Sequence, residues 1–130
     1  MGPPIRLKSG QLAGLLTEAR ARGWPVYHLA GPRCKQELLE QLAEVFGFPE
    51  YFGYNWDALE ECLGDLGWLD PASTRLLVWE ECFRLAQASL EDWRTALSVL
   101  AEVPGLKVAL LHTWWYEAVP NVTSSSAPAG

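Results

Sequence analysis

The chain has 130 residues, of which 49% are hydrophobic and 20% charged, and it carries a formal net charge of −6 at pH 7. This length and composition fit one globular domain and argue against an intrinsically disordered chain. The acidic balance disfavours general binding to phosphate backbones or anionic membranes. We therefore expect neither nucleic acid nor a membrane as a partner, and a basic protein fits better.

The charge is unevenly distributed along the chain. Residues 1–35 contain six basic side chains and one acidic side chain, which gives a net charge of +5. Residues 36–74 contain nine acidic side chains and no Lys or Arg, which gives −9. An electrostatic function is therefore expected within this acidic segment.

The N-terminus has no apolar run of signal-peptide length, and no stretch approaches a membrane span. The three cysteines, Cys34, Cys62 and Cys82, cannot all pair within one chain, and their spacing is not that of metal ligands. Free, mostly buried thiols in a reducing compartment are expected. These features predict a cytoplasmic protein.

The first predicted elements are a helix, a strand and a second helix. Ser9 can cap a helix over residues 9–22, whose leucines recur at helical spacing and which ends at Gly23. Residues 25–30 are rich in β-forming side chains and predict a strand. Residues 35–46 predict an amphipathic helix that ends at Gly47.

A short acidic helix is predicted over residues 56–66, with Asn55 as its N-cap. Its apolar stripe consists of Trp56, Leu59, Cys62, Leu63 and Leu66, and its acidic side of Asp57, Glu60, Glu61 and Asp65. Residues 76–79 then predict a buried strand. A helix capped by Ser89 extends to about residue 102, and residues 106–112 predict a last apolar strand.

Strands that alternate with helices predict a small α/β fold. We expect a three-stranded parallel sheet layered with about four or five helices, because the strands read as continuous apolar runs. The predicted domain covers residues 1–120, with a flexible tail over residues 121–130.

The acidic helix has two interpretations. Asp57, Glu61 and Asp65 follow one another at spacings of four residues, so their like charges repel, and no Lys or Arg on the helix offsets them. A solvated helix surface is the simpler interpretation. A protein-binding surface is the alternative, because Tyr51, Phe52, Tyr54 and Trp68 flank these acids.

An enzymatic function is disfavoured, and no catalytic residue or cofactor is expected. Two neighbouring carboxylates on a convex helix form no cleft for glycoside hydrolysis. His28 and His112 lie in or beside strands, where hydrogen-bonded structural histidines are common. Metal binding by Asp57 and Glu61 is disfavoured because Ca²⁺ and Mg²⁺ sites normally gather oxygens from a loop, and the sequence has no EF-hand pattern. The sequence also has no Gly-rich phosphate loop.

Residues 48–68, FPEYFGYNWDALEECLGDLGW, resemble the signature of the barstar family, the intracellular protein inhibitors of barnase-type ribonucleases. The resemblance extends from Val26 to Leu111 and implies a small parallel three-stranded sheet packed by helices. The helix over residues 9–22 and the segment after His112 look like additions to the minimal family fold.

The resemblance also implies a partner-binding site in which carboxylates replace RNA phosphate. Tyr51 matches the loop tyrosine that packs on the enzyme, Asp57 the acid at the helix start, and Glu61 the acid of the phosphate pocket, where barstar itself has Asp. Glu60 stands where barstar has a tryptophan. Trp68 matches the tryptophan that ends the motif, and Glu102 is the nearest candidate for a further acid on the later helix.

The leading hypothesis is therefore a cytoplasmic inhibitor that binds a barnase-type ribonuclease one-to-one and protects the producing cell from its own toxic enzyme. The alternative is a barstar-like interaction module with a partner that is not a barnase-type enzyme. The departures at Glu60 and Glu61, the added helix and the tail favour it. An acid-dependent hydrolase is the third hypothesis.

Overall fold

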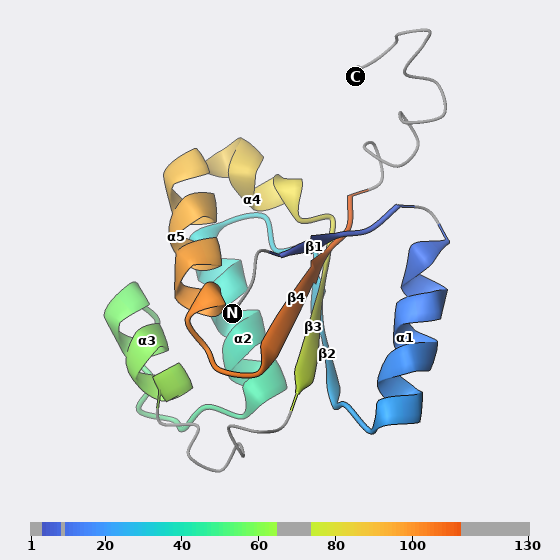
Figure 1. Ribbon diagram of the computed structural model, residues 1–130. Helices are drawn as coiled ribbons and strands as arrows, with labels where there is room; N and C mark the ends of the chain where they lie inside the picture. Colours follow the sequence, from blue (N-terminus) through green and yellow to red (C-terminus); the bar gives the residue numbers. More distant parts are fainter. Residues whose placement is uncertain (1–3, 9, 65–73, 113–130) are drawn as a thin grey trace, which may run out of the picture.

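The computed structural model describes residues 4–8, 10–64 and 74–112. Figure 1 shows a sheet with helices on both sides. In chain order the elements are β1 (Ile5–Arg6), α1 (Gln11–Arg22), β2 (Val26–Ala30), α2 (Lys35–Phe46), α3 (Trp56–Gly64), β3 (Arg75–Glu80), α4 (Phe83–Ala88), α5 (Leu90–Ala101) and β4 (Leu106–Leu110).

The strands form one parallel sheet in the order β1-β4-β3-β2. The α/β class and the parallel sheet are confirmed, but the expectation of three strands was one short, because β1 adds a fourth at the edge. Ile5 pairs with Ala109 of β4, and the N–H of Leu7 donates to the carbonyl of Leu110 at 2.9 Å. A two-residue strand carries no hydrophobic periodicity, so only its pairing with β4 reveals it.

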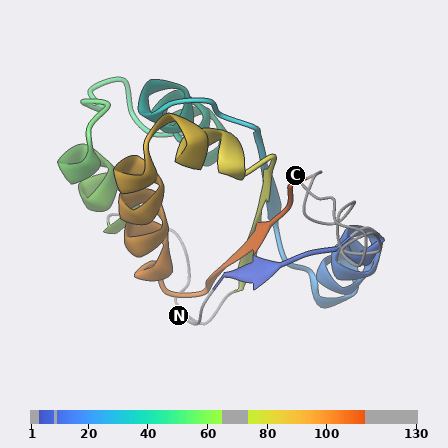
Figure 2. The ribbon, with the colours of Figure 1, turned by 90° about the horizontal axis from the view of Figure 1, so that it is seen from above.

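The central strand β3 is buried on both faces. Leu76, Leu77, Val78 and Trp79 have no exposed surface. Successive side chains of a strand point to opposite faces. Leu77 and Trp79 therefore enter the larger core under α2, α3, α4 and α5, whereas Leu76 and Val78 enter a smaller core under α1. Figure 2 shows these two layers on either side of the sheet.

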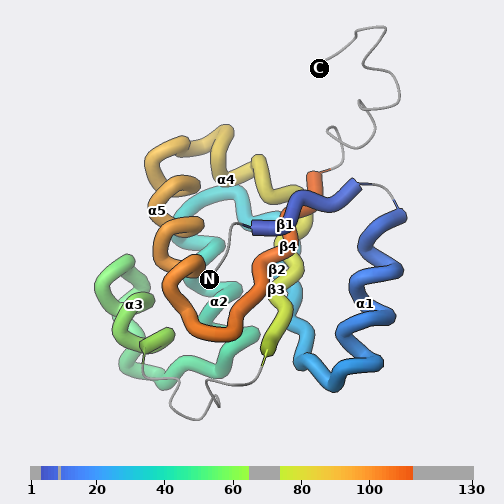
Figure 3. The backbone as a smooth tube through the Cα atoms, viewed as in Figure 1, coloured from blue at the N-terminus to red at the C-terminus, as the bar shows by residue number. Residues whose placement is uncertain are grey.

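Among the described elements, helix α1 is the one that covers the second face of the sheet. The chain leaves β1 at one edge, passes through α1 and enters β2 at the opposite edge, as the tube in Figure 3 shows. The fully buried Ala19 contacts this face, together with the half-buried leucines of the helix. The predicted cap Ser9 lies outside the described residues, and Gly10, in a left-handed conformation, immediately precedes the helix.

The helices on the other face can be compared with the predicted helices by their bounds and caps. α2 has the predicted bounds, and the hydroxyl of Ser89 caps α5 by accepting the N–H of Asp92 at 3.1 Å. α4 was not predicted, because six residues are too few for a periodic signal. The predicted last turn of the acidic helix, residues 65–66, and the tail over residues 121–130 lie outside the described residues.

None of the helices in the described ranges has the length and apolarity needed to cross a membrane. The thiol of Cys82 is buried, and burial raises its pKa to about 12, which makes it unreactive. Cys34 is exposed, so the expectation of mostly buried thiols was wrong for this residue.

The packing of α1 on the sheet predicts a specific sensitivity at Ala19. Ala19→Leu should destabilise the protein by about 1–3 kcal/mol, because the added methylenes have no space against the sheet. Ala13→Leu, on the exposed side of the same helix, is the matched control. Urea unfolding measures both variants, and equal midpoints would contradict the packing of Ala19.

Candidate functional site

The loop between α2 and α3, residues 47–55, contains a glycine that ends α2 and a hydrogen-bonded turn. Gly47 ends α2 in the left-handed region, with φ of 68°. The N–H of Phe52 then donates to the carbonyl of Pro49 at 3.0 Å, which closes a turn, and the Phe52 ring is buried. The loop therefore enters α3 from a defined position.

Asn55 caps α3 as predicted. Its Oδ1 accepts the N–H of Ala58 at 2.7 Å, and its carbonyl accepts the N–H of Leu59 at 2.9 Å as the first helical bond. The cap satisfies a backbone donor that would otherwise lack a helical partner. The ammonium of Lys35 also lies 5.3 Å from the centroid of the Trp56 ring, so the start of α3 is held against the start of α2.

The two sides of α3 differ as the sequence predicts. Leu59 and Leu63 are buried in the larger core, and Trp56 and Cys62 are half-buried beside them. The opposite side carries three exposed acids: Asp57, Glu60 and Glu61. Asp57 lies in the first turn, where the helix dipole favours a negative charge. We call Asp57, Glu60 and Glu61 the acidic surface.

A pocket of about 170 Å³ lies between the ends of α3 and α5. Its apolar lining includes Leu63, Val99 and Val103, and its acidic lining consists of Glu60 and Glu102. Glu102 is the exposed C-cap of α5. The fold therefore places this acid on the same pocket as Glu60, although the two residues are 42 positions apart in the sequence.

Of the two aromatic residues predicted for the site, Tyr51 and Trp68, the structure describes the first. Tyr51 is 83% exposed on the loop before α3. Trp68 lies outside the described residues. Tyr54, which the sequence only indicated as a flanking aromatic, is 43% exposed and directly precedes the cap Asn55. Its left-handed backbone, with φ of 54°, is invisible to sequence patterns because tyrosine seldom adopts it.

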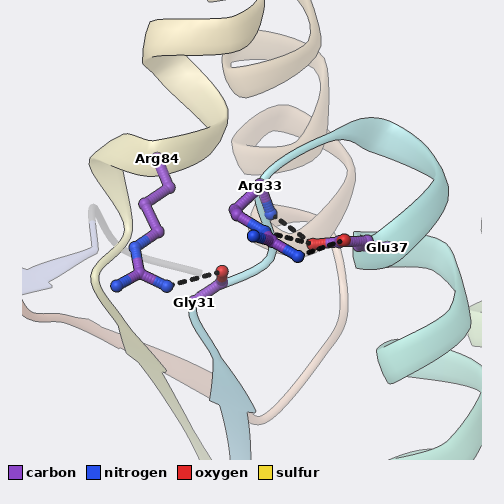
Figure 4. Close-up of polar contacts among 4 residues, drawn as sticks. All are labelled: Gly31, Arg33, Glu37 and Arg84. Atoms are coloured by element: carbon purple, nitrogen blue, oxygen red, sulfur yellow. Dashed lines mark hydrogen bonds and ion pairs between the residues drawn. The ribbon is translucent and has the colours of Figure 1, made fainter.

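A second polar cluster lies at the carboxyl ends of β2 and β3, away from the acidic surface. Figure 4 shows Arg33 and Glu37 pointing toward one another, and Arg84 reaching toward the carbonyl of Gly31. The backbone N–H of Arg33 donates to the Glu37 carboxylate at 2.9 Å, and the Arg33 guanidinium donates to it at 3.2 Å. Both hydrogen bonds lower the pKa of Glu37, and the one from the backbone N–H has the larger effect. These contacts connect the β2–α2 loop to the start of α2.

His112 is a buried, hydrogen-bonded histidine, as predicted. Its Nδ1 accepts the N–H of Phe83 at 3.2 Å and lies 3.5 Å from a Glu81 carboxylate oxygen. Burial lowers the pKa of His112. An Nδ1 that accepts a backbone hydrogen bond places the ring proton on Nε2. The contact therefore connects the end of β4 to the start of α4.

Within residues 4–8, 10–64 and 74–112, no group of three or more His, Cys, Asp or Glu side chains is arranged to hold a metal ion. The acidic surface instead offers carboxylates to a cationic partner. Carboxylates on a rigid, capped helix can accept charge-assisted hydrogen bonds from Arg, Lys or protonated His. The geometry suits recognition of a basic surface.

The fold and the site together define a small α/β protein that presents acids on one short helix. A family model described as Barstar (barnase inhibitor) matches residues 25–107, which is nearly two thirds of the chain. The chain therefore belongs to the barstar family. The match begins after α1, so β1 and α1 lie outside it. A search of curated proteins finds no match.

The capping of α3 predicts the effect of changing Asn55. Asn55→Ala should lower the free energy of unfolding by about 1 kcal/mol, because the N–H of Ala58 loses its acceptor. Asn55→Ser keeps an oxygen acceptor, so its free energy of unfolding should differ from that of the parent protein by less than about 0.5 kcal/mol. Chemical denaturation measures both, and equal losses would show that the cap contributes nothing.

The burial of His112 predicts a pH dependence of stability. Because the pKa of the folded state lies below the ordinary value of 6.5, the unfolded state binds this proton at higher pH. The stability that His112 contributes is complete above pH 6.5 and is lost as the pH falls through the folded pKa. The advantage of the parent protein over His112→Gln should therefore shrink between about pH 7.5 and about pH 5.5. Urea titrations of both proteins test this, and an advantage that grows on acidification would contradict it.

Proposed function

We propose that this protein is a cytoplasmic inhibitor of a barnase-type ribonuclease, which it binds one-to-one at the enzyme's active site. The observation that carries the proposal is the acidic surface of α3, in a chain of the barstar family. The acids lie in a segment without Lys or Arg from residue 36 to residue 74. The protein itself needs no catalytic residue for this function.

The mechanism is electrostatic imitation of the substrate. A ribonuclease presents Arg, Lys and His side chains to RNA phosphates, and Asp57 and Glu61 can occupy the same positions as carboxylates. The two acids are one helical turn apart, so both face the same side of the capped helix. Glu60, Glu102, Tyr51 and Trp68 complete the proposed contact surface. Self-repulsion among the acids is then relieved when the basic partner binds.

The consequence for a cell is immunity to its own toxic ribonuclease, since the complex blocks RNA from the active site. The second candidate is a barstar-like module that binds a different basic protein. Glu60 favours this candidate because barstar itself has a contact tryptophan at that position. An extra carboxylate there selects a partner with an additional cation opposite it.

The test is a titration of a purified barnase-type ribonuclease with the protein while RNA cleavage is followed. We expect activity to fall in proportion to added protein and to vanish near one equivalent. Asp57→Ala and Glu61→Ala should each weaken binding by more than about 1 kcal/mol, because truncation of residues that are buried in an interface has an effect of this size. Both variants should remain folded.

Glu91→Ala is the matched control, since it removes one exposed acid at the opposite end of α5 from the pocket. This variant should inhibit like the parent protein. If the double variant at residues 57 and 61 also inhibits like the parent, the assigned site is wrong. If excess parent protein leaves the ribonuclease fully active, the inhibitor function is wrong for this enzyme class and the second candidate replaces it.

A further inference from the structure

Tyr54 has an unusual combination of position and exposure. It is one of three large apolar or aromatic side chains that stay exposed in the described part of the chain: Tyr51, Tyr54 and Leu90. It directly precedes Asn55, so it stands beside the first turn of the acidic helix. The residue therefore immediately precedes the helix that carries the acidic surface, without belonging to that surface.

The backbone of Tyr54 is in the left-handed region, with φ of 54°. This conformation is disfavoured for any residue with a Cβ atom. Among the described residues, five of the seven positions with positive φ carry glycine, and the other two are Tyr54 and Glu81. The chain thus keeps a large aromatic side chain where local stability favours glycine or asparagine. Sparsely populated backbone conformations of this kind occur preferentially at functional sites.

The Tyr54 ring packs on a buried aromatic ring. Its centroid lies 4.8 Å from that of the buried Phe52. Phe52 contacts Phe48 at 5.0 Å, Phe48 stacks on Phe46 at 6.0 Å, and Phe46 contacts Tyr27 of β2 at 4.7 Å. A continuous series of aromatic rings therefore connects the sheet to Tyr54. A ring fixed in this way loses little conformational entropy when a partner covers it.

A purely structural role explains only part of this arrangement. A hydrophobic residue before an N-cap often packs on the fourth residue of the helix, which is Leu59 here. Leu59 is fully buried, whereas Tyr54 remains 43% exposed. Packing on the helix can account for the covered part of the ring and leaves its exposed part without a role.

We propose that Tyr54 is a partner-contacting residue whose exposed ring receives an arginine side chain of a basic protein. This proposal rests on the proposed function and adds a contact to the same interface. Tyr54 lies three residues before Asp57 in the chain, in a segment that contains no Lys or Arg from residue 36 to residue 74. A guanidinium can stack on an aromatic face and pair with a neighbouring carboxylate at the same time.

Tyr54→Asn separates recognition from stability, because asparagine tolerates the left-handed conformation but has no ring. We expect this variant to remain folded in urea titrations, because the relief of the left-handed backbone offsets part of the packing lost with the ring, and to inhibit a barnase-type ribonuclease about tenfold more weakly. Tyr54→Phe keeps the ring and should inhibit like the parent. Leu90→Ala removes a side chain of similar exposure on α5 and should leave inhibition unchanged.

Undiminished inhibition by Tyr54→Asn would overturn the proposal. A readout without ribonuclease distinguishes this failure from failure of the proposed function. With ¹³C-labelled tyrosine, an oligo-arginine peptide should shift the ring resonances of Tyr54 and leave those of Tyr27 in place, and an oligo-glutamate peptide should shift neither. If Tyr54 does not respond to the arginine peptide, the proposal is wrong, whatever the ribonuclease assay gives.

Discussion

The burial of β3 on both of its faces is the constraint on which the rest of the structure depends. Its central four residues are fully buried, so apolar layers must cover both sides of the sheet. The face reached by Leu77 and Trp79 takes four helices, and the face reached by Leu76 and Val78 takes α1. The positions of α2 and α5 over the first face, in turn, determine where α3 can pack.

The acidic surface depends on this packing because it is unfavourable by itself. Three acids within five residues of one helix repel one another. The repulsion is tolerated since Leu59 and Leu63 are buried on the other side of α3 and Asn55 closes its first turn. Stability gained in the core thus maintains a surface that a basic partner would neutralise.

Much of this arrangement is readable from the sequence, for physical reasons. Continuous apolar runs predict β2, β3 and β4, and the spacing of Leu59 and Leu63 predicts which side of α3 is buried. β1 and α4 escape prediction because they are too short to show a period. The proximity of Glu60 and Glu102 depends on the packing of α3 against α5, which no local pattern encodes. The backbone of Tyr54 likewise contradicts the local preference of its residue type.

The position of α1 makes stability and recognition separable along the chain. This helix lies outside the residues that match the family and on the opposite face of the sheet from α3. Its outer side, which includes Ala13 and Ala21, points to solvent. A fluorophore or a surface linker attached there leaves the acidic helix facing outward. The molecule can therefore be immobilised in a single orientation, with its recognition surface presented to the solution.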